Sequence, residues 1–467
     1  MTKQSKTYHL IGIGGIGVSG VAFALLARGH QVTGSDVRES QLTLALEAHG
    51  ATVHIGHSPD HLIGCDVVVY STAIPDSNPE LIAAREQGLD TRHRSEVLGE
   101  LVADFTQSVG VIGTHGKGTV SSAIAWCLEE AGRAPSFIIG GLLENFGKIN
   151  TRVKTDTLTS DDIIVVEVDE SDGSLINIHP TLAVVNNLEA DHLNYYEDLA
   201  HVQRTVAEAL NANPRLERVF INADCPGAME LIPLLSAPTT TFGRVLRDGG
   251  ADVEGRAAIA DFHGGHFVLA ERAKVLAELQ TGMPGLHNLD NCVAAAAVAL
   301  HLKIPVEALK AAFATFAGLE NRFTVVEAMN RLIIKDYISH PTGIRRVLEA
   351  AKTSGRRTTA VFKPYRFTMV NYLQDDYAEA FHDADHTIIT ELYPAGEVPI
   401  PGIDTEFLCN KIRSRGPRVT HVPAMTDIIS LLHKTINAGE QVVFFGGDDL
   451  FQLADRYADE LLKGHRK

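Results

Sequence analysis

Long apolar runs are missing from this chain of 467 residues. No stretch of 18 consecutive apolar residues occurs, so we expect no helix that spans a membrane. The first residues are polar and lead directly into an apolar strand, unlike a secretory signal with its charged start and apolar middle. These two absences predict a protein of the cytoplasm.

Cysteine is scarce as well. Only five cysteines occur, an odd number, and no two of them form a Cys-x-x-Cys pair. A disulfide framework or a structural zinc site usually needs closely spaced pairs. We therefore expect reduced thiols, mostly buried, in a reducing compartment.

An excess of positive charge is also lacking, because the formal net charge is −17. Such an acidic chain argues against nucleic acid or an anionic membrane as the main partner. It leaves small anionic substrates open, since a local basic pocket is enough to bind them. The hydrophobic share of 45% and the charged share of 21% are ordinary for a globular protein.

Short apolar strands alternate with helical segments along the chain, which is typical of α/β domains with parallel sheets. The glycine-rich polar alternation in residues 243–274 predicts a small antiparallel insert. We predict an α/β protein of three domains: a Rossmann-like domain at 1–106, a central domain of the P-loop ATPase type at 107–320, and a Rossmann-like α/β domain at 321–467.

A glycine motif, Gly12-x-Gly14-x-x-Gly17, follows the first predicted strand and opens a helix. Asp36 lies at the end of the next strand, near the spacing expected for an acid that binds a ribose. The glycines allow backbone N–H groups to approach a pyrophosphate at the helix N-terminus. The motif predicts a bound nucleotide but does not distinguish NAD, FAD and a UDP-sugar.

A second glycine-rich loop, Gly113–Thr119, connects an apolar strand to a helix and carries Lys117. This arrangement predicts a phosphate loop. The strict pattern has Ser or Thr directly after the lysine, whereas Gly118 stands there in this chain. Thr119 could still supply the hydroxyl for Mg²⁺ if the loop is one residue looser.

Acids and a histidine follow two later strands. Glu167 ends one apolar strand, and Asp191-His192 lie beyond the next. Ligands of open α/β sheets bind at the carboxyl ends of the strands. Beside a phosphate loop, these groups predict a metal site for phosphoryl transfer.

Further motifs are spread over nearly the whole chain. They are Ile11–Gly20, Ser71–Ile74, Asn78–Glu80, Gly113–Lys117, Glu167–Asp172, Glu189–His192, Pro284–Asn288, Asp336-Tyr337, His340–Thr342, Pro364–Arg366 and Tyr393–Glu397. In this order they resemble the Mur ligase family, and within it the ligases that join UDP-N-acetylmuramate to L-alanine.

The resemblance implies a carboxylate–amine ligase of peptidoglycan precursor synthesis, with ATP and Mg²⁺ as cofactors. ATP would phosphorylate the substrate carboxylate, and the amine of an amino acid would attack the acyl phosphate and leave an amide, ADP and phosphate. The expected partners are small molecules, UDP-N-acetylmuramate and an amino acid, with no nucleic acid and no membrane. A monomer or homodimer is expected.

The resemblance also implies roles for individual residues. The residues implied in catalysis are Lys117, Glu167, His192 and Arg322. Those implied in ATP binding are Gly113, Thr114, His115, Gly116, Lys117, Gly118, Thr119, His287, Asn288, Asn291, Arg322 and Asp336. Those implied in UDP-sugar binding are Gly14, Gly15, Ile16, Gly17, Ser19, Asp36, Ser71 and Ala73. Tyr337, His340 and Arg366 would bind the amino acid, and Thr119, Glu167 and His192 would bind Mg²⁺.

The chain departs from the family pattern at three places. Gly118 replaces the usual Thr, Ser339 replaces the first His of His-His-Pro, and Pro-His-Arg-Tyr-Thr-Arg becomes Pro364–Met369, with Tyr after Pro364 and Met369 at the end. Arg366 remains to pair with an amino-acid carboxylate. The last two changes fall where the incoming amine is held, so glycine, serine or a recycled peptide remain alternatives to alanine.

Two other classes remain as alternatives. The first glycine motif alone would fit an NAD-dependent dehydrogenase, although this class leaves the Lys117 loop unexplained. Gly118 would fit a catalytically idle binding or scaffold protein. Turnover of ATP distinguishes the ligase from both.

Overall fold

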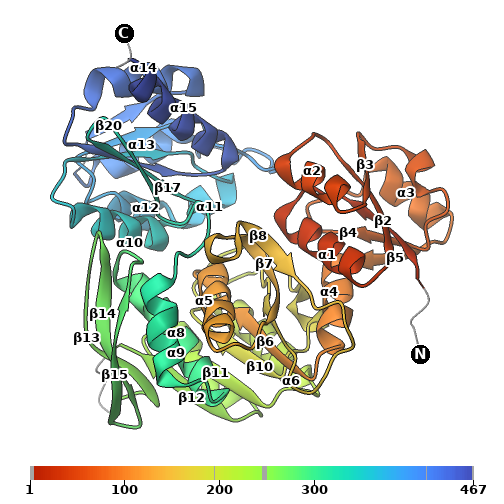
Figure 1. Cartoon of the computed structure of the whole chain (residues 1–467). Coiled ribbons are helices and arrows are strands. Elements are labelled where there is room, and N and C mark those ends of the chain that lie inside the picture. Colours follow the sequence, from red (N-terminus) through yellow and green to blue (C-terminus); the bar gives the residue numbers. More distant parts are fainter. Residues whose placement is uncertain (1–4, 194, 245–249, 417, 465–467) are drawn as a thin grey trace.

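The computed structural model describes residues 5–193, 195–244, 250–416 and 418–464. Three sheets, of five, ten and six strands, divide the chain into three α/β domains in sequence order (Figure 1). Within the described residues, none of the helices combines the length and the apolar character that a membrane span requires. The α/β class with largely parallel sheets is as predicted.

The first domain is a five-stranded parallel sheet with helices on both sides. Its elements are β1 (Thr7–Ile11), α1 (Ile16–Ala27), β2 (Gln31–Asp36), α2 (Gln41–Ala48), β3 (Thr52–Ile55), η1 (Pro59–Leu62), β4 (Val67–Tyr70), α3 (Pro79–Glu86), β5 (Asp90–His93) and α4 (Arg94–Ala103). The strand order is β3-β2-β1-β4-β5, so it reverses between β1 and β4. Ligands of such sheets bind at this reversal, next to the glycine motif.

The central domain has the largest sheet. Its elements are β6 (Gln107–Ile112), α5 (Lys117–Glu130), β7 (Ser136–Leu143), η2 (Glu144–Phe146), β8 (Ile149–Arg152), β9 (Ile163–Glu167), η3 (Ser174–Asn177), β10 (Leu182–Val185), α6 (Leu199–Ala212), β11 (Arg218–Asn222), α7 (Pro226–Met229), η4 (Ile232–Leu234), β12 (Thr239–Gly243), β13 (Val253–Asp261), β14 (Gly264–Glu271), β15 (Lys274–Thr281), α8 (Leu286–His301) and α9 (Val306–Thr315). The strand order is β15-β14-β13-β12-β11-β10-β6-β9-β7-β8.

Strands β6, β9, β10 and β11 are parallel and almost entirely buried, as their unbroken apolar sequences predict. The antiparallel pairing predicted for residues 243–274 is confirmed for β13 with β14. Instead of a separate insert, these strands continue the main sheet, because β13 pairs in parallel with β12. Residues 245–249 of this segment lie outside the described residues.

The third domain is a six-stranded sheet, parallel except for its first hairpin. Its elements are β16 (Thr324–Ala328), β17 (Arg331–Asp336), α10 (Pro341–Lys352), β18 (Thr358–Phe362), α11 (Phe367–Tyr372), α12 (Gln374–Ala380), β19 (His386–Ile389), α13 (Thr405–Arg413), β20 (Arg418–His421), α14 (Met425–Thr435), β21 (Gln441–Phe445) and α15 (Asp448–Gly464). Separate apolar clusters cover the two faces of the sheet, so β18 and β21 are buried along their whole length.

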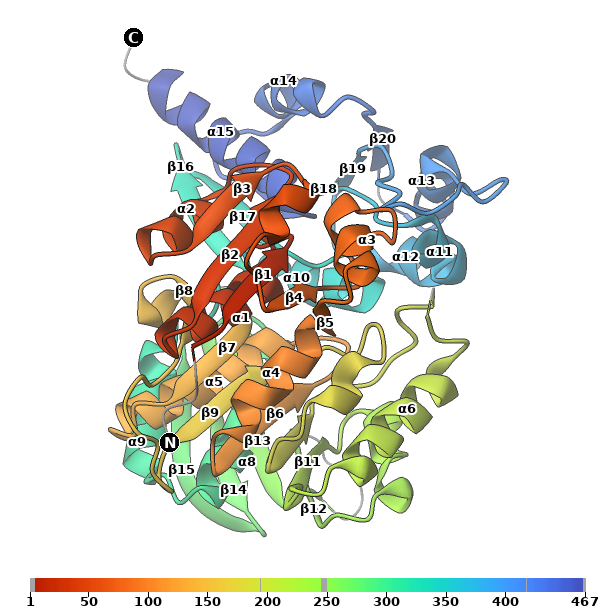
Figure 2. The same cartoon turned by 90° about the vertical axis from the view of Figure 1, so that its right-hand side faces the viewer.

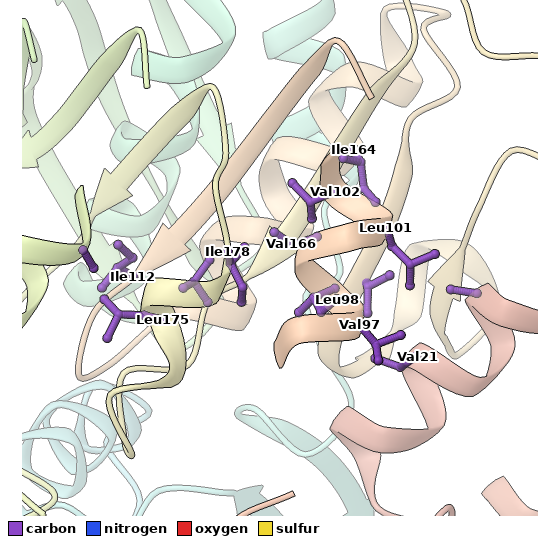
Figure 3. Packing of buried hydrophobic residues seen from close by; sticks show 14 of the residues in the cluster. Val21, Val97, Leu98, Leu101, Val102, Ile112, Ile164, Val166, Leu175 and Ile178 are labelled. Atoms are coloured by element: carbon purple, nitrogen blue, oxygen red, sulfur yellow. The ribbon is translucent and has the colours of Figure 1, made fainter. Parts of the chain in front are cut away.

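One apolar core joins the first domain to the central one. In it, Val21 of α1 and Leu98 of α4 belong to the same buried cluster as Ile164 and Val166 of β9 (Figure 3). Gly99 allows this close approach, because a Cβ there would lie 2.0 Å from a backbone oxygen of η3. The third domain contacts the central one through α10, which packs against α8 and β13 (Figures 1 and 2).

Candidate active site

A cavity of about 1220 Å³ lies where the three domains meet. Residues that follow the carboxyl ends of β4, β6, β9, β10 and β17 line it, as expected for open α/β sheets. Most of the predicted site residues line this cavity. They are Gly15, Ile16, Gly17, Ser71, Ala73, Thr114, His115, Gly116, Lys117, Gly118, Thr119, Glu167, His192, His287, Asn288, Asn291, Arg322, Asp336, Tyr337, His340 and Arg366.

The phosphate loop is held open by backbone conformation and by two asparagines. Gly116, the N-cap of α5, has a φ of 78°, and a Cβ there would lie 2.6 Å from Oδ1 of Asn291. The backbone N–H of His115 donates to Oδ1 of Asn187 at 2.7 Å. Asn186 donates from Nδ2 to the carbonyl of His115 and to Asn291. The loop therefore presents the N-terminus of α5 to the cavity, which is an arrangement that binds phosphate.

Lys117 is the cation of this loop. Its Nζ donates to the carbonyl of Gly113 at 2.6 Å and to Oε1 of Glu170 at 2.9 Å. Burial alone would lower the pKa of Lys117, but Glu170, Glu167 and Asp169 outweigh it and raise the pKa well above its usual range. The side chain is therefore a fixed positive charge, as phosphate binding requires.

Glu167 lies at the end of β9, and its Oε2 accepts the backbone N–H of Gly140 at 3.0 Å. A Cβ at position 118 would lie 3.2 Å from the same oxygen and 2.8 Å from Cδ1 of Leu319. Position 118, which lacks a side chain here, is therefore beside the acid. Thr119, predicted to supply the hydroxyl, is buried but lines the cavity.

His192 lies near Glu170, the acid that also contacts Lys117. Its Nε2 is 3.7 Å from Glu170 and 3.8 Å from Asp191. Burial lowers the pKa of His192, but these two acids outweigh it, so the pKa is raised. A metal ion bound by this ring would have to replace its proton.

His287, Asn288 and Asn291, predicted to bind ATP through its adenine, lie in the first turns of helix α8. Burial lowers the pKa of His287 to about 3, with help from Arg346 and Arg244, so the ring is neutral. Asn288 donates to the carbonyl of Pro284 at 2.8 Å. Asn291, in contrast, contacts Asn186 and Asn288, so it also supports the phosphate loop.

Arg322 and Asp336 lie at the junction of the central and third domains. Nη1 of Arg322 donates to the carbonyl of Tyr337 at 3.2 Å and is 3.9 Å from Asp336. Asp336 accepts the backbone N–H of Phe323 at 2.9 Å. Burial raises the pKa of Asp336 to about 6, although Arg322 and this hydrogen bond lower it.

In the first domain, Asp36, which was predicted to bind the UDP-sugar, instead forms a hydrogen bond with the backbone of the glycine loop. Asp36 accepts the backbone N–H of Gly14 at 2.9 Å, and Ser19 is buried and donates to the carbonyl of Ile16. Neither Asp36 nor Ser19 lines the cavity, and nor do Gly14 and Gly113. These four residues instead help to set the conformation of the two glycine-rich loops.

The sequence analysis missed several charged residues of the cavity. Arg94 lies across the start of α1, since a Cβ at Gly17 would be 2.9 Å from its Nη1, and Arg94 also contacts Asp169. Arg244 forms an ion pair with Asp290 near the adenine segment. Arg94 directly follows β5 and Arg244 directly follows β12, so the same rule about the carboxyl ends of strands could have found them.

Arg366, predicted to hold the amino-acid carboxylate, has a φ of 64° and begins α11. Its guanidinium lies over the ring of Tyr365, and its Nε has no hydrogen-bond partner among the described residues. Ser339 also lines the cavity, whereas Met369 packs against the core of the third domain. Of the three changed residues in this region, Ser339 lines the cavity, and Tyr365 and Met369 do not.

Comparison with known proteins identifies the family. The models "Mur ligase family, catalytic domain", "Mur ligase middle domain" and "Mur ligase, glutamate ligase domain" match residues 7–106, 111–299 and 321–447. The chain belongs to the Mur ligase family. It is an ATP-dependent ligase, so the dehydrogenase alternative is wrong.

Relatives of this Mur ligase match over their whole length. A UDP-N-acetylmuramate–L-alanine ligase of Geotalea daltonii is 37% identical, with 99% of both chains covered, and one of Desulfatibacillum aliphaticivorans is 34% identical, with 98% and 99% covered. Among solved structures, a UDP-N-acetylmuramate–alanine ligase from Thermotoga maritima has a TM-score of 0.81 at 24% identity, covering 98% of this chain and all of the other. A murein peptide ligase from Psychrobacter arcticus has a TM-score of 0.73 at 25% identity, covering 98% and 99%.

Proposed function

We propose that this Mur ligase forms an amide bond between UDP-N-acetylmuramate and L-alanine at the expense of ATP. The observation that carries the proposal is the single cavity that joins the phosphate loop, the glycine loop of the first domain and Arg366 of the third. The names of the full-length relatives support the two substrates. We propose that the reaction serves peptidoglycan precursor synthesis in the cytoplasm.

In the proposed reaction, an oxygen of the sugar's carboxylate attacks the γ-phosphorus of ATP, and ADP leaves. The amine then attacks the acyl carbon, phosphate leaves, and the amine loses a proton. Lys117 would hold the β- and γ-phosphates, and Arg322 would add positive charge from the domain junction. Positioning and fixed charges of this kind account for most of the catalysis of phosphoryl transfer.

The donor set around the phosphate loop fits Mg²⁺, which prefers oxygen ligands. Glu167 would hold one ion with the hydroxyl of Thr119, and His192 would contact a second. The ion would neutralise charge on the phosphate oxygens. Glu170 would orient Lys117 and His192, since it lies within 3.7 Å of both.

The three domains would divide the substrates. We propose that residues 1–106 bind the UDP-sugar, residues 107–320 bind ATP, and residues 321–467 bind the amino acid through Tyr337, His340 and Arg366. Asp336 would accept hydrogen bonds from the ribose of ATP. We propose that a monomer or homodimer is active.

A second candidate is a ligase that adds another amine to the same nucleotide sugar. Ser339 favours it, because this short side chain lines the same cavity as Arg366, at a position where the family usually has histidine. A wider space there would accept serine, glycine or a preformed peptide. The structural similarity to a murein peptide ligase is compatible with this alternative.

Release of phosphate tests the proposal. Purified protein is incubated with ATP, Mg²⁺ and UDP-N-acetylmuramate, and alanine, serine, glycine and an Ala-Glu-diaminopimelate tripeptide are added in turn. We expect release with alanine and none without the sugar. Phosphate release with only one of the other amines would show that this amine is the substrate. No phosphate release with any of the four would refute the proposed substrate pair.

A further inference from the structure

Three side chains with metal-binding atoms meet at one wall of the cavity. They are His115 of the phosphate loop, Glu189 after β10, and His340 at the start of α10. One ring nitrogen of each histidine and one carboxylate oxygen of Glu189 all lie within 4.8 Å of one another. The two rings have centroids 4.6 Å apart. None of the three is among the residues predicted to bind Mg²⁺.

Hydrogen bonding within the protein leaves this cluster incompletely satisfied. Nε2 of His115 and Nε2 of His340 are both buried and have no hydrogen-bond partner among the described residues. Nε2 of His115 lies 3.5 Å from Oε2 of Glu189, beyond the usual length of an N–H···O bond. Buried polar atoms without partners call for an explanation, and an ion is one of the few available.

The distances suit a small tetrahedral ion. Zinc binds imidazole nitrogen and carboxylate oxygen at about 2.0–2.2 Å, so two ligands of a tetrahedral site lie roughly 3.3–3.5 Å apart. Nε2 of His115 lies 3.5 Å from Oε2 of Glu189. Nδ1 of His340 accepts the N–H of Thr342, so the unpartnered Nε2 is the nitrogen left for the ion.

We infer that His115, Glu189 and His340 form a binding site for a transition-metal ion of the zinc class. Two imidazoles and one carboxylate are a known ligand set for zinc, with a fourth position left for water or substrate. With two nitrogen ligands and one oxygen, this set suits zinc better than Mg²⁺, whose ligands are mainly oxygens. The open position faces the cavity, because all three residues line it.

The site would link two domains. His115 and Glu189 belong to the central domain and His340 to the third, where its Nδ1 caps α10 by accepting the N–H of Thr342 at 3.3 Å. Thr342 already crosses the same boundary by donating from Oγ1 to Glu189 at 2.8 Å. A bound ion would hold α10 against the phosphate loop and resist opening of the cavity.

Binding of Zn²⁺ alone tests the inference and does not depend on ligase activity. Calorimetry in millimolar Mg²⁺ is expected to find one tight Zn²⁺ per chain. His115→Asn, Glu189→Gln and His340→Asn should each weaken it at least about tenfold, since each removes one of the ligands. Asparagine at 340 can still cap α10, and circular dichroism checks that each variant folds.

Two controls separate this site from others. His433 and Glu460 form an exposed pair 3.1 Å apart without a third ligand, so His433→Asn should leave binding unchanged. Glu167→Gln should also bind Zn²⁺ normally, because it changes only the proposed Mg²⁺ site. Co²⁺ in place of Zn²⁺ should give the absorption of a tetrahedral ion without thiolate ligands.

Several results would overturn the inference. Equal Zn²⁺ affinity in the wild type and the three variants would place the ion elsewhere, and a thiolate absorption band with Co²⁺ would place it on a cysteine. Loss of binding in Glu167→Gln would assign the ion to the proposed Mg²⁺ site. Failure to bind Zn²⁺ at all would reject the site while leaving the ligase proposal intact.

Discussion

Nζ of Lys117 and Oε1 of Glu170 lie 2.9 Å apart, and the Glu170 side chain is only 2% exposed. Glu170 also lies 3.7 Å from His192. One buried carboxylate thus faces the cation of the phosphate loop and the histidine beyond the next strand. When phosphates enter, they would share Lys117 with Glu170, which keeps the ammonium in place throughout the reaction.

Lys117→Met should reduce kcat by about 10²–10³-fold or more, because it removes the fixed positive charge that stabilises the negative charge developing on the phosphates. The affinity for UDP-N-acetylmuramate should stay nearly the same, since that substrate is assigned to the first domain. Phosphate release and calorimetry measure the two quantities. Lys148→Met is the control, because Lys148 is half exposed and pairs with Glu320. Loss of sugar binding in Lys117→Met would contradict the division of substrates among domains.

Gly118→Thr should lower the free energy of unfolding by about 1–3 kcal/mol, the usual cost of an overpacked site. A Cβ there would lie 2.8 Å from Cδ1 of Leu319, which is buried. Leu319→Val removes that atom, so in a double-mutant cycle the two changes should cost less together than their sum. Denaturant unfolding measures all four proteins. Strict additivity would show that Leu319 does not exclude a side chain at position 118.

Much of the fold could be predicted because its strands are unusual in sequence. The apolar runs of β6, β9 and β10 can be stable only when both faces are buried, and a glycine loop between strand and helix has few structural alternatives. The ends of these strands identified Lys117, Glu167 and His192 as cavity residues. Local sequence was sufficient to predict these three residues because the parallel strands that precede them all end at the same edge of the central sheet.

Contacts between domains could not be predicted in the same way. Arg94 meets Asp169 across the junction of two domains, and Glu189 meets Thr342 across another. No local period or spacing records such distant pairs. The role of Asp36 also depended on the fold, because its carboxylate binds the backbone of Gly14 and does not line the cavity.

Glu80→Gln should destabilise the first domain by about 2–4 kcal/mol at pH 7, because it breaks a buried network of charged hydrogen bonds. Glu80 is fully buried and contacts Ser35, His57 and His61, with His9 at 3.5 Å. Burial raises the pKa of this carboxyl, but the bonds from His9, Ser35 and His61 outweigh it and lower the pKa to about 2.

The sign of the pH dependence follows from that lowered pKa. Ionised Glu80 stabilises the fold above its ordinary value of 4.5, and this contribution is lost as the pH falls from there towards 2. The difference in the free energy of unfolding between the wild type and Glu80→Gln should therefore become smaller below about pH 4.5. Thermal unfolding at several pH values measures it, with the exposed Glu86→Gln of the same helix as control. A stability difference that grows as the pH falls would contradict the lowered pKa of Glu80.

Asp336→Asn should raise the free energy of unfolding and weaken the binding of ATP. Burial raises the pKa of Asp336 from 3.8 to about 6, against the opposing effects of Arg322 and the Phe323 N–H. The protonated form is favoured by folding below 3.8, and that advantage is lost as the pH rises through 6. Ionised Asp336 therefore costs up to about 3 kcal/mol at pH 8, and asparagine removes this cost.

We expect Asp336→Asn to raise the free energy of unfolding by about 1–3 kcal/mol at pH 8 and by almost nothing near pH 4. The KM for ATP should rise roughly 10- to 100-fold, the value of a charged hydrogen bond to the ribose. Denaturant unfolding and steady-state kinetics measure the two effects. Asp375→Asn is the control, because Asp375 is 86% exposed and forms an ion pair with the surface residue Lys411. A less stable Asp336→Asn at pH 8 would mean that Arg322 and the Phe323 N–H outweigh burial, and an unchanged KM would remove Asp336 from the ATP site.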